Sequence, residues 1–179
     1  ESTLKNAVSQ HGQSLYAISF ESQILLTFLR HFGCLFCQEQ VAELARIRRP
    51  LEVGGVRIAF VHMEPETEAQ PFFESYGVGD AHRFHDPDRV LYEAFELQRG
   101  SGTQIWGLPV IARALKLVLT GKAAFTRPTA DVKQMPGLFL LHEGRIERAF
   151  RPRKISEKPD YTQLADCNVC DIDFTNEPA

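Results

Sequence analysis

Apolar residues in the first third of the chain alternate between continuous runs and helical spacing. Residues 24–29 form an apolar run broken only by Thr27, which favours a strand buried on both faces. Between residues 37 and 45 the apolar positions recur every three or four residues, which predicts a helix that ends before Pro50. Residues 56–62 predict a second buried strand. The order strand, helix, strand indicates a parallel α/β sheet.

Shorter elements surround these three. Residues 14–18 predict a short edge strand that precedes the first buried run. The aromatic stretch at 72–76 predicts a helix that ends at Gly77. A third strand is expected to end near Asp86, and either Asp86 or Asp88 is placed to cap the helix that follows.

The second half of the chain predicts a helix and a hairpin. Residues 109–121 have an apolar stripe typical of an amphipathic helix, with a proline in the first turn and a glycine at the stop. Residues 122–133 are rich in turn formers. Residues 138–142 and 145–150 flank Glu143-Gly144, which is a hairpin signal.

Composition narrows the class of protein. The chain has 179 residues, 44% hydrophobic and 24% charged, which is ordinary for a soluble globular domain. A formal net charge of −3 gives no indication of nucleic acid or an anionic membrane as a partner. No apolar stretch reaches about 18 residues, and no signal peptide is recognisable at the start. All four cysteines lie in CxxC pairs, which favours a reducing compartment, so we expect a cytoplasmic protein.

The first of these pairs is the strongest chemical signal in the chain. Cys34 and Cys37 lie between the first buried strand and the helix that follows, an arrangement that thiol–disulfide chemistry uses. A helix that begins near Cys34 directs its free N–H groups and positive dipole end at the first sulfur and stabilises a thiolate. Helical spacing puts Cys37 toward the core and Cys34 at the exposed rim. His31 either lowers the Cys34 pKa or takes a proton, or else it is an ordinary polar residue at a strand end.

The order of these elements resembles a thioredoxin-like domain, in which a cis-proline faces the redox pair at the position of Pro136. More specifically, residues 28–37 are similar to the "FLR-x-FGC-x-FC" segment of peroxiredoxin-like proteins in the alkyl hydroperoxide reductase/thiol-specific antioxidant superfamily. That group includes selenoprotein L and the peroxiredoxin-like-2 proteins. Asp86-Pro87 resembles its "DP…YxxF" element, and residues 109–121 with 134–139 resemble its insert and "Q-x-GG-x-F" strand.

The resemblance implies a thioredoxin-like α/β fold, a central mixed sheet flanked by helices. We expect one domain over residues 1–164 with a helical insert at about 100–134, and a cysteine-containing tail at 165–179. It also implies that Pro136 shapes the groove for an incoming backbone, the alternative being a plain loop proline. Peroxiredoxins have Thr or Ser three residues before the peroxide-attacking cysteine, where this chain has His31, so their usual peroxide pocket is not encoded.

The second pair, Cys167 and Cys170, leaves several interpretations open. It is either a second dithiol that relays electrons to Cys34 and Cys37, part of a four-thiolate zinc site, or a structural or incidental pair. More than a hundred residues separate the two pairs, far beyond the spacing of roughly 15–20 in a zinc ribbon.

The resulting hypothesis is a thiol–disulfide oxidoreductase with a peroxiredoxin-like antioxidant role. Cys34 attacks a disulfide or an oxidant, and Cys37 resolves the intermediate, without a cofactor. Electrons are expected from a thioredoxin- or glutathione-type donor, and a homodimer is permitted. One alternative is a thiol peroxidase with Cys34 as the peroxidatic cysteine. The other is a non-enzymatic module whose CxxC pairs bind zinc or form disulfide staples.

Overall fold

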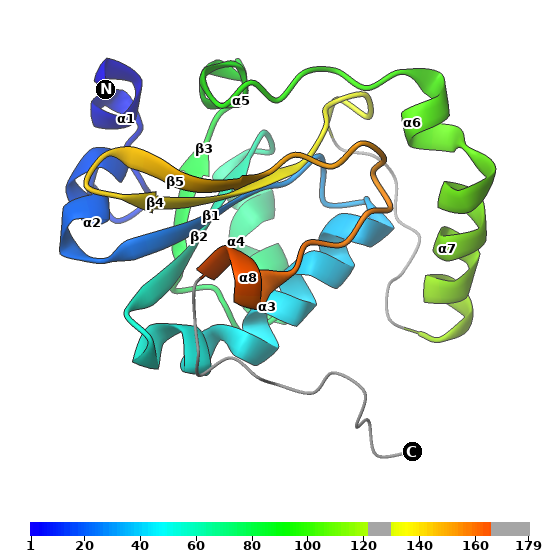
Figure 1. The fold of residues 1–179 in the computed structure, drawn as a ribbon, viewed down its shortest axis with the longest axis horizontal. Coiled ribbons are helices and arrows are strands. Elements are labelled where there is room, and N and C mark those ends of the chain that lie inside the picture. Colours follow the sequence, from blue (N-terminus) through cyan, green and yellow to red (C-terminus); the bar gives the residue numbers. More distant parts are fainter. Residues whose placement is uncertain (122–129, 166–179) are drawn as a thin grey trace.

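One five-stranded mixed sheet organises the molecule, in the order β3-β2-β1-β4-β5 (Figure 1). The structure is a computed structural model and describes residues 1–121 and 130–165. β1, β2 and β3 run parallel, and β4 runs antiparallel to both β1 and β5. The predicted thioredoxin-like mixed sheet is therefore confirmed. The strands are β1 (Gln23–Phe28), β2 (Val56–His62), β3 (His82–His85), β4 (Gly137–His142) and β5 (Arg145–Phe150).

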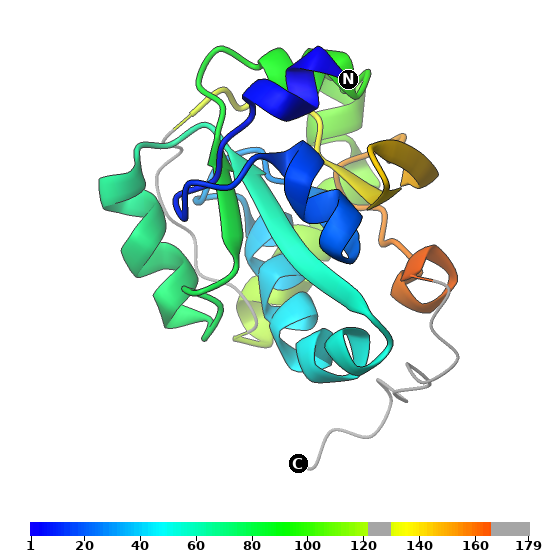
Figure 2. The same cartoon turned by 90° about the vertical axis from the view of Figure 1, so that its left-hand side faces the viewer.

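Helices cover both faces of the sheet, as the two views in Figures 1 and 2 show. α3, α4 and α8 pack on one face, while α1, α2 and α5 pack on the other. The helices are α1 (Ser2–Asn6), α2 (Leu15–Glu21), α3 (Leu35–Val53), α4 (Glu66–Ser75), α5 (Val90–Ala94), α6 (Gly102–Trp106), α7 (Leu108–Leu119) and α8 (Tyr161–Ala165). Within the described residues, no helix is long and apolar enough to cross a bilayer.

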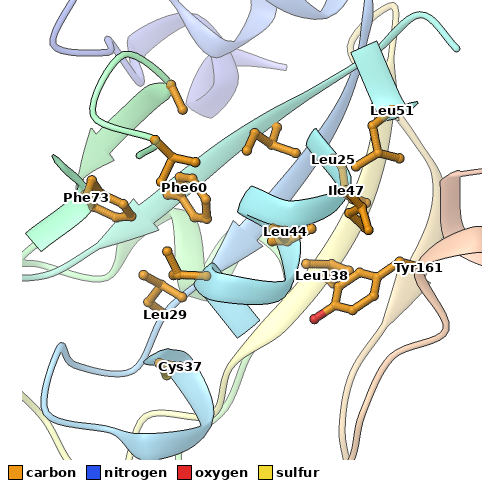
Figure 3. Packing of buried hydrophobic residues seen from close by; sticks show 14 of the residues in the cluster. Leu25, Leu29, Cys37, Leu44, Ile47, Leu51, Phe60, Phe73, Leu138 and Tyr161 are labelled. Carbon is orange, nitrogen blue, oxygen red and sulfur yellow. The ribbon is translucent and has the colours of Figure 1, made fainter. Parts of the chain in front are cut away.

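The period of two along β1 divides the core into two layers. Leu25 and Leu29 face α3, where Leu44 packs against them (Figure 3). Ile24 and Phe28 face the opposite helices. The β1 side chains of Ile24, Leu25 and Phe28 are fully buried, so β1 is a central strand buried on both faces, as its continuous apolar run predicts.

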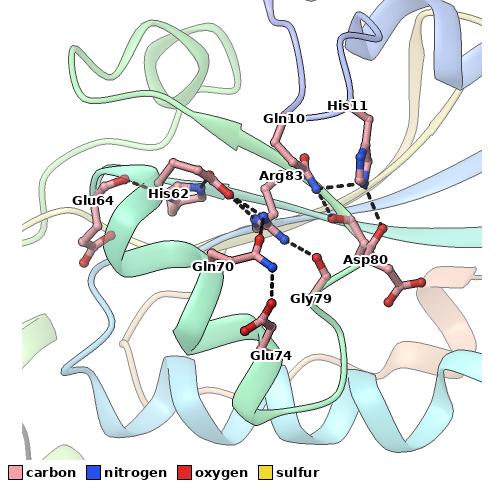
Figure 4. A network of polar contacts seen from close by, with 11 residues as sticks. Gln10, His11, His62, Glu64, Gln70, Glu74, Gly79, Asp80 and Arg83 are labelled. Carbon is pink, nitrogen blue, oxygen red and sulfur yellow. Dashed lines mark hydrogen bonds and ion pairs between the residues drawn. The ribbon is translucent and has the colours of Figure 1, made fainter.

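The edge formed by β3 is covered by the N-terminal segment. The Gln10 backbone N–H donates to the Arg83 carbonyl at 3.2 Å, and the Arg83 N–H donates to Gln10 Oε1 at 2.7 Å (Figure 4). The Gln10 amide also donates to the Ala81 carbonyl at 2.7 Å. The buried Arg83 guanidinium pairs with Glu66 on α4, which joins the edge strand to its covering helix. These contacts occupy backbone groups that an edge strand otherwise exposes.

Two predicted elements differ from the structure. Residues 14–18, predicted as an edge strand, begin α2: Ser14 caps the helix by accepting a hydrogen bond from the Ala17 N–H at 3.1 Å. Leu15 and Ile18 lie about one helical turn apart and are both buried. Five residues are too few to distinguish this helical spacing from the alternation of a strand. α3 continues through Pro50 to Val53, because Leu51 is fully buried in the core and holds the last turn in place.

The insert forms a small cluster of its own. α6 and α7 contribute Ile105 and Val110, which pack with Met135, Ile155 and Phe36 of α3. The predicted amphipathic helix at 109–121 is α7, and the predicted hairpin is β4 and β5. The tail beyond residue 165 and most of the turn-rich segment at 122–133 lie outside the described residues.

Candidate active site

The first CxxC pair lies where β1 gives way to α3. Cys34 is the residue that precedes the first turn of α3, and Cys37 lies within that turn. The connecting loop is fixed by its backbone: the Phe32 N–H donates to Glu64 Oε1 at 2.8 Å, and the Gln38 side chain donates to the Phe32 carbonyl at 2.9 Å. The Arg30 N–H donates to Cys37 Sγ at 3.3 Å. The strand-to-helix position predicted for the pair is confirmed.

Both cysteines are free thiols, and both are buried. Cys37 is 1% exposed and faces the core below α3, as expected (Figure 3). Cys34 is 5% exposed, so the prediction of an exposed rim position is wrong. The physical reason is that the chain after β5 and the side chain of Arg113 on α7 close over the start of α3.

A buried arginine accompanies the pair. Arg30 is 4% exposed, and its Nη1 donates to Cys34 Sγ at 3.3 Å. Its Nε donates to the Gln134 carbonyl at 2.9 Å, and its Nη2 donates to the Val132 carbonyl. Two neutral carbonyls and one sulfur are thus the described partners of this cation. A buried charge favours an opposite charge beside it, so the Cys34 thiolate is the form of the sulfur that suits this environment.

The two thiols have opposite pKa shifts. A hydrogen bond from Cys37, the positive charge of Arg30 and the first-turn N–H groups of Cys37 and Phe36 lower the pKa of Cys34 to about 6, against the opposing effect of burial. Burial, followed by the interaction with Cys34, raises the pKa of Cys37 well above its ordinary value. At neutral pH the arrangement therefore holds one thiolate and one thiol, with the charge on Cys34.

His31 does not supply the cation at this site. Its side chain is buried, and burial together with the charge of Arg30 lowers its pKa to about 4, so it is neutral at pH 7. Its Nδ1 has no hydrogen-bond partner within the described structure. The neighbour that the sequence interpretation passed over is Arg30. Arg30 lies inside the "FLR-x-FGC-x-FC" segment, which was the only sequence feature that pointed to it. The sequence does not show whether Arg30 or His31 turns toward the Cys34 sulfur.

Pro136 lies at the same pocket as the dithiol. Cys34, Cys37, Pro136, Gly137 and Arg113 line a pocket of about 30 Å³, room for little more than a water molecule. Because no peptide bond in the described ranges is cis, the bond before Pro136 is trans, unlike the cis-proline expected from the resemblance. The predicted juxtaposition of proline and redox pair is present, with a different backbone isomer.

The second pair, Cys167 and Cys170, lies outside the described residues. Within residues 1–121 and 130–165, no group of three or more His, Cys, Asp or Glu side chains is arranged to hold a metal ion. The alternatives for the second pair therefore stay as the sequence leaves them.

Comparison with known proteins shows what this chain is similar to in sequence and in fold. No family profile matches the chain. Peroxiredoxin-like 2C from Homo sapiens is 29% identical over 177 residues, which cover 91% of this chain and 76% of that protein. Among solved structures, Xanthomonas campestris peroxiredoxin Q superposes with a TM-score of 0.62 at 16% identity, covering 94% of this chain and 90% of that one. MTB dsbF superposes with a TM-score of 0.55 at 13% identity, covering 93% and 96%.

These similarities show that the chain resembles peroxiredoxin-like proteins in sequence and has a thioredoxin-like fold. The resemblance drawn from the sequence is thereby confirmed. At these identities the solved structures establish the fold, while the particular reaction has to be argued from the site.

Proposed function

We propose that the protein is a thiol–disulfide oxidoreductase that works through Cys34 and Cys37. The observation that carries the proposal is the pairing of a buried guanidinium with Cys34, whose pKa is about 6, beside a Cys37 thiol whose pKa is raised. A thiolate is the nucleophile in disulfide exchange, and a low pKa makes it available at neutral pH.

The exchange then takes two steps. The Cys34 thiolate attacks one sulfur of a substrate disulfide, so that a Cys34–substrate disulfide forms and the other substrate sulfur leaves as a thiolate. Cys37, after losing its proton, attacks the Cys34 sulfur. The Cys34–Cys37 disulfide forms, and the second substrate thiolate leaves. The substrate is reduced by two electrons and the protein is oxidised by two.

A thioredoxin- or glutathione-type dithiol or thiol is the reductant we propose for the return step. One dithiol, or two monothiols in succession, attacks the Cys34–Cys37 disulfide through a mixed disulfide and leaves as a disulfide, which restores both protein thiols. A reducing compartment such as the cytoplasm suits this cycle, because it maintains a supply of such donors.

Insulin reduction with dithiothreitol as the donor tests the proposal. We expect wild-type protein to accelerate the reaction, Cys34→Ser to abolish the acceleration, and Cys37→Ser to accumulate a mixed disulfide detectable by mass spectrometry. A Cys167→Ser/Cys170→Ser double variant shows whether the second pair takes part. Wild-type protein that performs no better than Cys34→Ser would overturn the proposal.

The second candidate is a thiol peroxidase, which the small size of the pocket and the name of the human relative favour. The Cys34 thiolate would attack the terminal oxygen of a hydroperoxide: an S–O bond forms, the O–O bond breaks, and the alcohol leaves after taking a proton. Cys37 then condenses with the sulfenic acid, and water leaves. Peroxide consumption with a thioredoxin donor, compared with Cys34→Ser, separates this reaction from disulfide exchange.

A further inference from the structure

The dithiol pocket is too small for a polypeptide disulfide. Both sulfurs are at most 5% exposed, and the space beside them is about 30 Å³. A small oxidant fits this space, whereas a disulfide within a folded or extended polypeptide does not. Exchange with such a substrate therefore requires one wall of the pocket to move.

One wall has no helix or strand. Residues 151–160, which we name the strap, run from β5 to α8 across the start of α3 (Figure 1). Pro152, Ile155 and Lys158 of the strap line the pocket with the two cysteines. The other walls belong to α3, β4, β5, α7 and α8, together with Cys34 and Pro136, which directly precede α3 and β4.

Two cations latch the strap to α3. Lys158 pairs with Glu39 at 2.9 Å and also with Glu43. Arg113 of α7 donates to the strap carbonyl of Ser156 and pairs with the same Glu39. The Glu39 side chain is 10% exposed while that of Lys158 is 48% exposed, so the latch joins a buried acid to an accessible cation.

Opening the strap costs less than moving the other walls. Two strap residues are buried, Pro152 and Ile155. Ile155 belongs to a hydrophobic cluster whose other buried members are Ile105, Val110 and Met135. The adjoining wall of β4 carries Leu138 and Leu140 in the main core, and α3 carries Leu44 and Leu51. Displacing either would bring several fully buried side chains into contact with water, which is strongly unfavourable. The latch is also partly exposed, so its ion pairs are of modest strength and are weakened by salt.

We propose that Lys158 determines which oxidants reach Cys34, because its ion pairs hold the strap closed. Small oxidants enter the closed pocket, and polypeptide disulfides react once the strap lifts. The inference rests on the proposed function, since it concerns access to the same cysteine. It can be tested separately, because access to Cys34 is measurable even in a protein that shows no enzymatic turnover.

Two uncharged thiol reagents of different size test the latch. Iodoacetamide is small, and a 5-kDa polyethylene glycol maleimide is bulky. The labelling rate of Cys34 is followed at pH 8 by peptide mass spectrometry with fragmentation, because Cys34 and Cys37 lie on one tryptic peptide and only fragment ions locate the label at Cys34. The readout is the ratio of the two rates, because any change in thiolate fraction affects both reagents alike. We expect Lys158→Met to raise the bulky-to-small ratio at least threefold.

Lys154→Met is the matched control. Lys154 is an exposed lysine of the same strap, and its substitution is expected to leave the ratio unchanged. Equal ratios for Lys158→Met and Lys154→Met overturn the inference. If Lys158→Met fails to fold, the same ratio is measured for wild-type protein at about 1 M NaCl, where the screening length is about 3 Å. A higher ratio at that salt concentration supports the latch, and an unchanged ratio overturns it.

The outcome separates from that of the proposed function. If Lys158→Met changes the labelling ratio but the wild type does not reduce insulin, the latch is supported and the proposed oxidoreductase activity is rejected. If the wild type reduces insulin but Lys158→Met leaves the ratio unchanged, the activity is supported and the latch is rejected.

Discussion

Arg30 Nη1 lies 3.3 Å from Cys34 Sγ inside the protein, and both residues are no more than 5% exposed. The two groups are four residues apart on a loop that leaves a central strand. The loop that follows β1 carries both residues and therefore brings the guanidinium to the sulfur. This pairing makes the reactivity of Cys34 depend on one neighbouring side chain.

Replacing Arg30 by Met is expected to shift the alkylation profile of Cys34 toward higher pH. In the wild type the iodoacetamide rate should rise with a midpoint near pH 6, because the thiolate is the reactive form and the pKa of Cys34 is about 6. Loss of the guanidinium removes a stabilising charge, and below the midpoint each unit of pKa rise lowers the rate about tenfold.

Arg30→Lys and Arg49→Met are the controls for this prediction. Lysine retains the charge and should restore part of the shift, while Arg49 is exposed near the far end of α3 and should have no effect. A pH profile for Arg30→Met that overlays the wild type would contradict the role assigned to Arg30.

Asp86 is expected to stabilise α5 as a cap. Its carboxylate accepts hydrogen bonds from the N–H groups of Val90 at 2.9 Å and Leu91 at 2.8 Å. Asp86→Ala should lower the free energy of unfolding by about 1–2 kcal/mol, measured by urea denaturation. Asp88→Ala is the matched control, since Asp88 is exposed, and an equal loss in both variants would contradict the assignment.

His62 is expected to make the protein less stable in acid. Its imidazole is fully buried, and burial lowers its pKa from 6.5 to about 4. Between these values the unfolded chain takes up a proton that the folded protein does not, so the free energy of unfolding falls as the pH falls. The loss reaches up to about 3 kcal/mol. His62→Gln should make this slope less steep in urea titrations from pH 7 to pH 4 and leave the part that the buried His31 contributes. His85→Gln, at an exposed position, should retain the full slope.

Tyr92 is expected to hold the loop that carries the site. Its hydroxyl donates to the carbonyl of Leu29, directly before Arg30, and lies 3.2 Å from that of Val61. Tyr92→Phe leaves the Leu29 carbonyl without this partner inside the core, at a cost of about 1–3 kcal/mol in urea denaturation. Tyr16→Phe, at a partly exposed position, should cost far less, and a similar loss for both would contradict this account.

Most of the fold could be predicted from local pattern. The sequence predicts the second strand at residues 56–62, the bounds that it has, because this run is apolar apart from Arg57 and His62 and has no helical period. Residues 14–18 were mistaken for a strand because five residues are too few to separate the two periods. The position of Cys37 in the core followed from helical spacing with Leu44.

The site itself could be predicted only in part. Helical spacing placed Cys34 at a rim, but its burial comes from the strap and from Arg113, which are distant in sequence. No periodicity in residues 151–160 indicates that they cross α3. The choice between Arg30 and His31 as the neighbour of the sulfur depends on how a loop turns after its strand, which tertiary contacts determine.

The cover that Gln10 provides for β3 has a practical consequence for anyone shortening this chain. A variant trimmed before Ser14 would keep every cysteine and the whole core face of α3. It would also leave the Arg83 backbone open to another molecule's strand. Such a variant should self-associate through the β3 edge as its concentration rises. The residues before Ser14 are therefore expected to prevent the sheet from extending into another molecule.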